Sequence, residues 1–316
     1  MTHREAAAFL KSHDRYVILT HRRPDGDTCG CAAALCLALR QMGKTAAVYE
    51  NPQFTSRFRP WLTGLTQAAI SPDDTVLSVD IAAENLLPFG AEDMAGRIQL
   101  AIDHHGSHSL ACRRCLLEAE KAACGEILYA LFRELDVNIT KQMAEALYIA
   151  ISTDTGCFKY SNVTGNTLRV AAGLIDCGAD VAPINKIFFD TKTFARLKLE
   201  ARLTSSIELY AGGLVGVCTL PRAWLKELGI SEDDIDSISG FARSIEGVEI
   251  GVMIREVEGG MGKISLRTSP RYDAAALCQQ LGGGGHAAAA GCSVPGGIDA
   301  AKAAILDVLR RSGVAL

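Results

Sequence analysis

Aspartate and histidine side chains follow four separate hydrophobic segments of this 316-residue sequence. The densest group is Asp103-His104-His105, which comes directly after the apolar run 98–102. The other candidates stand at the ends of three further segments: His21, Asp25 and Asp27, then Asp80, then Asp154. Carboxylates and imidazoles together suit Mn²⁺, Mg²⁺ or Co²⁺, whereas thiolate-rich sites select zinc. The pattern predicts a site for more than one metal ion, and hydrolysis of a phosphate ester is the leading hypothesis.

The elements around these residues alternate between strand and helix. Short β-rich runs occupy 16–20, 46–49, 75–79 and 97–102, and helical spacing occupies 29–42, 126–135 and 142–151. Strands separated by helices predict an α/β fold with a doubly wound, mainly parallel sheet. In such sheets ligands bind beyond the carboxyl ends of the strands. We therefore expect His21, Asp80 and Asp103 to meet at one edge.

Two of these motifs also have a purely structural explanation. Asp25-Gly26 is common turn chemistry, and Asp27 or Thr28 could be the residue that caps the following helix. Asp154 could simply belong to the turn that ends a helix. A cap or a turn does not exclude metal binding by the same side chain. The presence of all the clusters in one chain favours the metal site.

Asp80 alone is a weak indication of a metal site, whereas the Asp103-His104-His105 triplet is a stronger one. An aspartate at a strand end often caps a helix or binds water, although a carboxylate can also bridge two cations. The triplet could be a solvated strand end, but the apolar run before it places it at the functional edge of the sheet. Side chains alternate along an extended segment, so one histidine can bind a metal while the other faces the substrate. Asp103 would then orient a histidine ring.

The sequence pattern changes in the second half of the chain. We expect a first domain at 1–184, a charged helical connector at 185–207, and a second, smaller α/β domain at 208–316. The size of the second domain is within the ordinary range for an independent unit. Its strands are interrupted by glycine pairs at 212–213 and 259–260, which indicates hairpins.

Four glycines at 282–285 precede His286 and form the other distinctive segment. Glycine backbone can approach a phosphate closely, and His286 or the nearby Arg267 can add positive charge. A flexible linker is the alternative explanation. Because linkers seldom lie between a helix and another compact element of one domain, a phosphate-binding loop is favoured.

Composition and charge restrict the class of function. A net charge of −4 argues against a protein that coats long duplex nucleic acid, but it is compatible with a short anion bound by a few arginines. No apolar run approaches the roughly 20 residues that span a bilayer, and no signal peptide is evident, so we expect no membrane partner and a cytoplasmic location. The eleven scattered cysteines suggest reduced thiols. Cys112 and Cys115 have CxxC spacing, but without a second CxxC a structural zinc site is disfavoured.

Together these residues resemble the DHH phosphoesterase superfamily, in the branch whose second domain is called DHHA1. Within it they are most similar to bacterial oligoribonucleases that also hydrolyse 3′-phosphoadenosine 5′-phosphate (pAp), the nanoRNase A type. The family motifs match 21–30, Asp80, Asp103-His104-His105 and Asp154, and the DHHA1 pattern matches 265–267, 282–286 and 289–291. The resemblance spans almost the whole chain. It implies two Mn²⁺ ions, with Mg²⁺ or Co²⁺ as substitutes.

The resemblance also implies a role for each matching position. One ion would be held by His21, Asp25 and Asp80. The other would be held by Asp27, Asp80, His104 and Asp154, with Asp80 as the bridge. His105 would contact the scissile phosphate, supported by Asp103. The far end of the nucleotide would be held by Arg267, Gly283, Gly284, Gly285 and His286, with Arg243 as a weaker candidate.

The substrates implied by the resemblance are short. Di- to tetranucleotides of RNA would yield nucleoside 5′-monophosphates, and pAp would yield AMP and phosphate. One alternative is a phosphodiesterase for linear dinucleotides such as pApA or pGpG, or for cyclic dinucleotides. Another is a non-catalytic nucleotide-binding regulator of the same fold, which the complete set of metal-binding positions disfavours. The sequence leaves a homodimer open.

Overall fold

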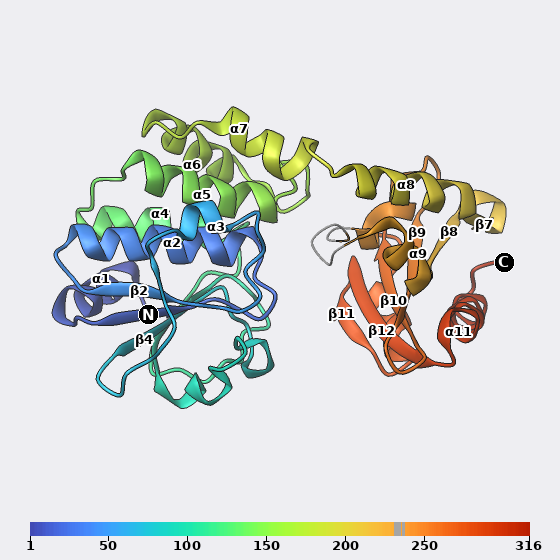
Figure 1. The fold of residues 1–316 in the computed structure, drawn as a ribbon, viewed down its shortest axis with the longest axis horizontal. Helices are drawn as coiled ribbons and strands as arrows, with labels where there is room; N and C mark the ends of the chain where they lie inside the picture. Colours follow the sequence, from blue (N-terminus) through green and yellow to red (C-terminus); the bar gives the residue numbers. More distant parts are fainter. Residues whose placement is uncertain (231–234, 236–237) are drawn as a thin grey trace. The chain divides into compact units, whose positions relative to one another are not determined.

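A six-stranded parallel sheet forms the centre of the first unit of the computed structural model, Met1–Thr191 (Figure 1). The second unit is Lys192–Leu316, and the structure describes residues 1–230, 235 and 238–316. The strands of the first sheet are β1 (Tyr16–Leu19), β2 (Ala46–Tyr49), β3 (Thr66–Gln67), β4 (Thr75–Val79), β5 (Ile98–Asp103) and β6 (Cys115–Leu117). Every neighbouring pair is parallel, which confirms the predicted α/β fold.

The strand order β3-β2-β1-β4-β5-β6 reverses between β1 and β4. β2 and β3 extend from one side of β1, and β4, β5 and β6 extend from the other side. Such a reversal is the point at which open parallel sheets bind ligands, beyond the carboxyl ends of the strands. The segments that follow β1, β4 and β5 therefore leave the sheet next to one another.

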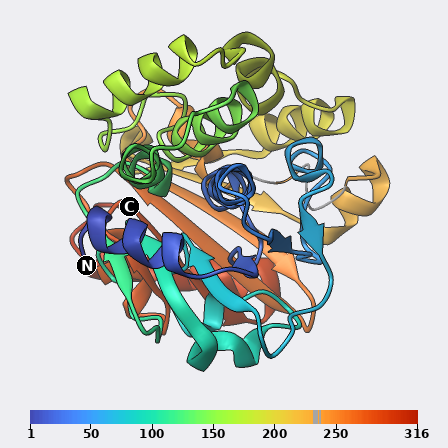
Figure 2. The same cartoon turned by 90° about the vertical axis from the view of Figure 1, so that its left-hand side faces the viewer.

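Both faces of this sheet are buried. Along β1, Tyr16 and Ile18 belong to the apolar cluster on one face, and Val17 and Leu19 belong to the cluster on the other. Burial on both sides explains why the strand is continuously apolar. Figures 1 and 2 show α2, α4 and α5 along one side of the sheet. The longer helices that contribute to that side are α1 (His3–Ser12), α2 (Gly26–Gln41), α4 (Cys124–Leu135), α5 (Lys141–Asp154) and α6 (Gly165–Asp176), and the short helices α3 (Arg59–Leu62) and α7 (Val181–Asn185) add one buried residue each.

The remaining segments of the first unit are short. The opposite face of the sheet is covered by loops together with the 3-10 helices η1 (Glu84–Leu86) and η2 (Glu92–Arg97). The helix α3 (Arg59–Leu62) lies before β3. The unit ends in α7 (Val181–Asn185) and a π-helical turn, η3 (Lys186–Asp190).

Two glycines allow α2 to pack closely on α5. A methyl group at Gly26 or at Gly30 would clash with atoms of α5. The two positions are one helical turn apart and therefore lie on the same face of α2. This close approach brings Asp25 and Asp27, at the start of α2, up to the end of α5, where Asp154 is the last helical residue.

The second unit contains a mixed six-stranded sheet of order β11-β12-β10-β9-β8-β7. Its strands are β7 (Glu208–Tyr210), β8 (Val215–Leu220), β9 (Ile250–Val257), β10 (Met261–Thr268), β11 (Gly284–His286) and β12 (Ala289–Pro295). β8 and β9 are parallel and the other pairs are antiparallel. Its helical elements in the described residues are α8 (Phe194–Ser206), η4 (Ala211–Gly213), α9 (Arg222–Leu228), η6 (Ile238–Ser244), α10 (Ala274–Gln279) and α11 (Gly297–Arg311).

The glycine-rich segment differs from the prediction. We expected a loop over 282–285, but Gly284–His286 is the edge strand β11, paired with β12. The turn after α10 ends at Gly282, which has a φ of +74°, and Gly283 leads into the strand. Glycine carries no strand signal in the sequence, so this pairing depends on the neighbouring strand and not on local propensity.

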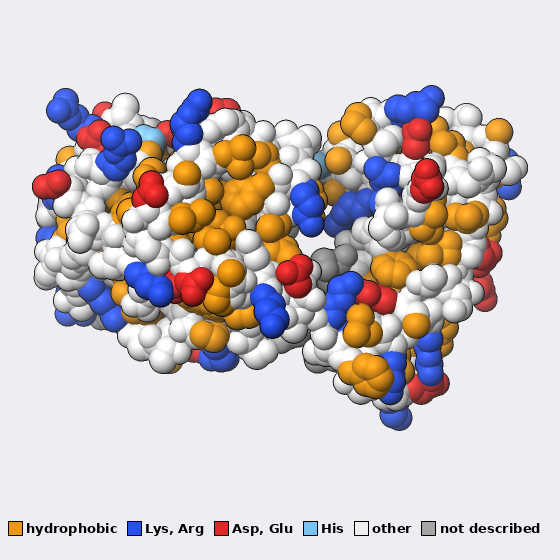
Figure 3. All heavy atoms as spheres, turned by 90° about the horizontal axis from the view of Figure 1, so that it is seen from above, with side chains coloured by type: hydrophobic (Ala, Val, Ile, Leu, Met, Phe, Trp, Pro, Cys, Tyr) orange, Lys and Arg blue, Asp and Glu red, His pale blue; other side chains and the backbone are white. Residues whose placement is uncertain are grey.

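The surface of the first unit is mixed in character. On the face drawn in Figure 3, its Lys and Arg side chains are interspersed with Asp and Glu around an apolar area. Leu168 and Ile175 of α6 are among the exposed large apolar residues of the chain. Within the described residues, no helix combines the length and the apolar character needed to cross a bilayer.

Candidate metal centre and nucleotide-binding face

Asp80 lies between two groups of candidate metal ligands. It follows β4 with a φ of +59°, and its backbone N–H donates to the carbonyl oxygen of Ile102 on β5 at 2.9 Å. Its Oδ2 lies 3.7 Å from Nε2 of His21, and its Oδ1 lies 3.5 Å from Nε2 of His104. The side chain is 3% exposed, and Oδ1 has no hydrogen-bond partner. A buried carboxylate oxygen without a partner is costly unless a cation binds it.

The first group of ligands follows β1. Asp25 caps α2, because its Oδ1 accepts from the N–H groups of Asp27 and Thr28 at 3.0 and 3.2 Å. The expected cap at Asp27 or Thr28 is wrong, since the helix begins at Gly26 and both residues lie inside it. The same oxygen of Asp25 lies 3.4 Å from Nε2 of His21. One side chain therefore starts the helix and faces a candidate ligand.

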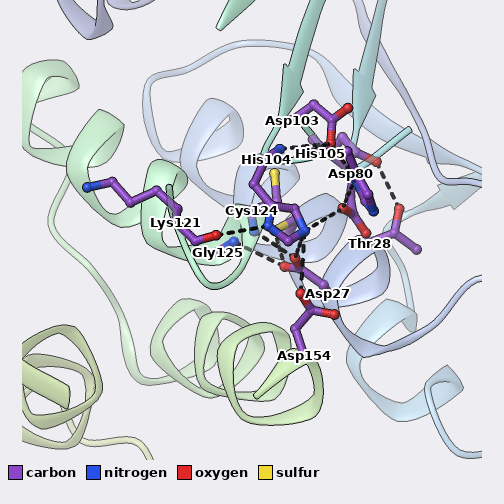
Figure 4. Close-up of polar contacts among 12 residues, drawn as sticks. Asp27, Thr28, Asp80, Asp103, His104, His105, Lys121, Cys124, Gly125 and Asp154 are labelled. Atoms are coloured by element: carbon purple, nitrogen blue, oxygen red, sulfur yellow. Dashed lines mark hydrogen bonds and ion pairs between the residues drawn. The ribbon is translucent and has the colours of Figure 1, made fainter. Parts of the chain in front are cut away.

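The second group joins three elements around His104. Its Nε2 lies 3.3 Å from Oδ2 of Asp154 and 3.7 Å from Oδ2 of Asp27. Figure 4 shows the ring among the carboxylates of Asp27, Asp80 and Asp154. Nδ1 of His104 lies 3.1 Å from the carbonyl oxygen of Lys121. His21 has the same arrangement, with Nδ1 against a backbone carbonyl oxygen at 2.9 Å. Each ring is thus held so that Nε2 can bind a metal.

Asp27, in the first turn of α2, is fully buried, and its carboxylate faces the N-terminus of α4. Its carboxylate accepts from the N–H groups of Cys124 and Gly125 at 2.6 and 3.0 Å, and the thiol of Cys31 donates to it at 3.2 Å. A helix N-terminus stabilises negative charge, which makes this buried carboxylate tolerable. These amide donors were not predicted from the sequence. The available signal was Ala123, an N-cap residue without a side chain able to cap α4.

Asp103 holds His105. Its Oδ1 lies 2.8 Å from Nδ1 of His105 and also accepts from the backbone N–H groups of His104 and His105. Its Oδ2 lies 2.5 Å from Nδ1 of His108, a neighbour that the sequence pattern did not indicate. The hydrogen bond to Asp103 and its negative charge raise the pKa of His105, although burial acts in the opposite direction. The ring of His105 therefore has Nδ1 engaged and Nε2 available to a substrate.

Three carboxyl groups of the cluster have raised pKa values, because burial and neighbouring negative charges disfavour their ionised forms. Burial, and then the charge of Asp25, raises the pKa of Asp27 to about 7. Burial, and then the charges of Asp27 and Asp25, raises the pKa of Asp154 to about 7, and burial raises that of Asp80 well above its usual value. Ligand atoms of His21, Asp25 and Asp80 lie within 4.8 Å of one another, as do those of Asp27, His104 and Asp154. A buried, acidic site with imidazole nitrogens and a partnerless oxygen fits divalent cations.

These pKa shifts predict how pH affects the metal-free protein. As the pH rises from about 4 to about 7, the free energy of unfolding of the wild type should decrease relative to that of the Asp154→Asn variant. The reason is that the folded state, with its raised pKa, binds more protons than the unfolded state in this interval. Each pKa unit corresponds to about 1.4 kcal/mol. Thermal unfolding of both proteins in chelator across this range measures the difference.

Saturating Mn²⁺ supplies the control for this pH experiment. Because a cation favours the ionised carboxylate, wild type should then be the more stable protein at pH 7. A constant difference between wild type and Asp154→Asn across the pH range in chelator would contradict the raised pKa.

In the second unit, Arg267 and His286 share one face of the sheet. Arg267 of β10 is paired with Ala289 of β12, and Ala289 is paired with His286 of β11. Residues directly opposite one another in antiparallel strands point to the same face. On its other side, Arg267 is paired with Gly251 of β9. The row therefore places an arginine and an exposed histidine on either side of a small residue.

The helix η6 brings Arg243 to the same face. A methyl group at Gly251 would clash with Arg243, so η6 lies directly over the row that contains Arg267. The guanidinium of Arg267 donates to Oγ of Ser239 in η6 at 3.0 Å. The guanidinium of Arg243 donates to the carbonyl oxygen of Val248. Two of the candidate substrate-binding residues, far apart in sequence, thus meet at one helix.

The glycines before His286 have a structural role of their own. A methyl group at Gly283 would clash with Cys292 of β12. Gly285 has a φ of +146°, and a methyl group there would also meet β12. Gly284 faces open space, and His286 is exposed. The glycines allow β11 to approach β12, and phosphate binding by this segment stays a prediction.

Both halves of the chain are similar to known protein families. Residues 15–151 match the DHH family, N-terminal domain, and residues 214–311 match the DHHA1 domain. The bifunctional oligoribonuclease and PAP phosphatase NrnA of Thermus thermophilus is 31% identical over 93% of this chain and 88% of the relative. A probable manganese-dependent inorganic pyrophosphatase of Lactiplantibacillus plantarum is 28% identical over 61% of this chain and 62% of the relative. An exopolyphosphatase-related protein from Bacteroides fragilis has the same fold, with a TM-score of 0.89, 23% identity, and coverage of 98% of this chain and 96% of that one.

Proposed function

Because the chain belongs to the DHH/DHHA1 phosphoesterase family, we propose that it hydrolyses short oligoribonucleotides and pAp with the help of manganese. The products would be nucleoside 5′-monophosphates from di- to tetranucleotides, and AMP and phosphate from pAp. The observation that carries the proposal is the likeness over nearly the full chain to the Thermus thermophilus enzyme, whose name states both activities. The Asp/His cluster supports it, because hydrolysis of phosphate esters is typical chemistry of paired metal ions.

The donor set of the cluster supports manganese, with Mg²⁺ or Co²⁺ as substitutes. Carboxylate oxygens and imidazole nitrogens suit these ions. We assign one ion to His21, Asp25 and Asp80, and the other to Asp27, Asp80, His104 and Asp154. When bound, the ions would activate water and stabilise the charge that develops at the phosphate. The relative from Lactiplantibacillus plantarum, described as manganese-dependent, points to the same metal.

His105 is the side chain that we assign to the scissile phosphate. Asp103 holds Nδ1 of His105 at 2.8 Å, so the ring cannot turn freely and Nε2 faces away from that carboxylate. The raised pKa keeps the ring protonated to higher pH than an ordinary histidine. A proton at Nε2 can then be donated to a phosphoryl oxygen as its negative charge increases.

We assign nucleotide binding to the face of the second sheet that carries Arg267 and His286. A guanidinium binds phosphate through paired N–H groups, and an exposed imidazole adds a second donor. Arg243 borders the same face, where its guanidinium donates to the carbonyl oxygen of Val248, and we retain it as the weaker candidate. Two positive side chains suit a short anion better than a long duplex.

The state of the cysteines bears on the cellular setting. All eleven cysteines are free thiols in the structure, which suits a reducing, cytoplasmic location. A homodimer stays a prediction, and we propose no membrane partner.

A substrate panel tests the proposal. With Mn²⁺ present, we expect faster hydrolysis of di- to tetranucleotides and of pAp than of a long single-stranded RNA at equal concentration. The reason is that the chain carries a net charge of −4 and the proposed face holds few positive groups. Product chromatography with pApA, pGpG and pyrophosphate as further arms measures the ranking.

Chelated wild type and the Asp80→Asn variant are the controls for contaminating nucleases, and both should be inactive. Equal rates on long RNA would contradict the proposal. Strong preference for pApA or pGpG over RNA dinucleotides and pAp would indicate a phosphodiesterase for linear dinucleotides instead.

A further inference from the structure

His108, Cys112 and Cys115 form a second group of potential metal ligands beside Asp103. One ligand atom from each residue lies within 4.8 Å of the other two. Nε2 of His108 lies 3.5 Å from Sγ of Cys115. None of the three belongs to the Asp/His cluster assigned to manganese.

Strand pairing explains why these residues meet. β6 begins at Cys115 and pairs with Ala101 of β5, and the N–H of Arg113 donates to the carbonyl oxygen of Ile98 at 3.0 Å. The chain between the two strands turns back at once, because the N–H of His108 donates to the carbonyl oxygen of His105 at 3.0 Å. The CxxC segment is thereby held against the turn that carries His108.

We propose that His108, Cys112 and Cys115 bind a zinc ion, separate from the ions of the Asp/His cluster. Two thiolates and an imidazole are a preferred donor set for Zn²⁺. With Zn–S near 2.3 Å and Zn–N near 2.0–2.1 Å, sulfur and nitrogen ligands of a tetrahedral site lie about 3.6 Å apart. The 3.5 Å between Nε2 of His108 and Sγ of Cys115 matches that spacing.

Asp103 supplies the partner that a zinc-binding histidine usually has. Its Oδ2 lies 2.5 Å from Nδ1 of His108, so that nitrogen is engaged and Nε2 is directed at the sulfur atoms. Histidines that bind metals commonly donate their other N–H to a carboxylate in this way. His21 and His104 show the equivalent arrangement with backbone carbonyl oxygens.

The surroundings of the thiols argue against a reactive redox pair. Burial, and then the neighbouring Cys112 and Asp103, raises the pKa of Cys115 to about 12. Reactive redox cysteines have the opposite property, a lowered pKa and an exposed thiolate. Cys112 and Cys115 are partly exposed, whereas the His108 side chain is 8% exposed, so water can reach the site from the side of the thiols and complete the coordination of the ion.

Cobalt substitution distinguishes this site from the Asp/His cluster. Co²⁺ bound by thiolates has a charge-transfer absorption band in the near ultraviolet, whereas Co²⁺ bound by carboxylates and imidazoles does not. We expect the reduced, metal-free full-length protein to develop this absorption as Co²⁺ binds and to lose it when Zn²⁺ is added. The Cys112→Ser and Cys115→Ser variants should lack the band, and His108→Asn, which keeps a donor for Asp103, should weaken it. Elemental analysis after zinc loading should show about one equivalent less zinc per chain in the two serine variants.

Two variants serve as matched controls. Cys177→Ser changes another partly exposed cysteine and should keep the band and the zinc, and Asp80→Asn, which alters the other cluster, should also keep the band. Thermal unfolding in Mn²⁺ checks that every variant is folded. A band of equal strength in Cys112→Ser and Cys115→Ser would overturn the proposal. The proposal would also be overturned if mass spectrometry of the protein, kept under reducing conditions, found a Cys112–Cys115 disulfide and no bound zinc.

Discussion

Replacing Asp80 with asparagine should abolish hydrolysis of every substrate and reduce the metal content of the protein. The two oxygens of Asp80 face different groups, Oδ2 toward His21 and Oδ1 toward His104, so one substitution affects both proposed ions. Loss of an outer-shell partner typically lowers metal affinity about 10- to 100-fold, and a shared direct ligand should cost more than that. Asparagine tolerates the positive φ at this position, which makes it a better test than alanine.

Asp25→Asn is the matched control for this experiment, because it makes the same chemical change at a ligand of only one group. The side chain of Asp25 is 55% exposed, compared with 3% for Asp80, so its loss should be tolerated better. Elemental analysis and initial rates at saturating Mn²⁺ compare the two variants. If Asp80→Asn still bound two ions per chain, the bridging assignment would be wrong.

His105→Ala should lower kcat on all substrates by about 10²- to 10⁴-fold with a modest change in KM, as expected when a proton donor to the transition state is lost. His286→Ala should do the reverse and raise KM for dinucleotides and pAp about 10- to 100-fold, the equivalent of one charge-assisted hydrogen bond. Steady-state kinetics of the two variants, run in parallel on one substrate set, provide the comparison. Neither substitution removes an assigned metal ligand, so metal content should stay at the wild-type level.

An aryl phosphodiester without a second nucleotide sharpens this contrast. His286→Ala should cleave it at nearly the wild-type rate, whereas His105→Ala should be impaired on it as strongly as on a dinucleotide. Arg267→Lys, which keeps the charge but removes the paired N–H groups, should behave like His286→Ala. If His286→Ala lost metal, or lost activity on the aryl ester, the assignment of chemistry and nucleotide binding to separate units would fail.

The main features of the fold followed from local patterns in the sequence. Apolar runs such as 98–102 fit a strand buried on both faces, and their alternation with helical segments predicted the parallel sheet that the structure confirms. Parallel strands share one carboxyl edge, so the residues after β1, β4 and β5 could be placed near one another before any contact was known. The limits of short elements were less predictable, as the strand β11 shows.

Contacts between distant segments could not be read from local patterns. The carboxylate of Asp27 accepts from the N–H of Cys124, 97 residues later, and nothing near Ala123 indicates which side chain supplies the missing cap. Arg243 and Arg267 meet at η6 because Gly251 has no side chain to separate them. Both contacts depend on which elements pack together, and that is a property of the whole domain.

The sequence by itself determined the chemistry that is present, namely carboxylates and imidazoles at strand ends and a CxxC pair of no obvious use. Only the tertiary structure decided which of these side chains lie together and which atoms face one another. Placing Asp80 at the ends of β4 and β5, in a left-handed conformation, turns its two oxygens toward different histidines. Pairing of β5 with β6 brings the CxxC segment to His108, so that Asp103 holds His105 with one oxygen and His108 with the other. A residue's type limits what it can bind, whereas its partners are set by the strand register and helix packing that bury it.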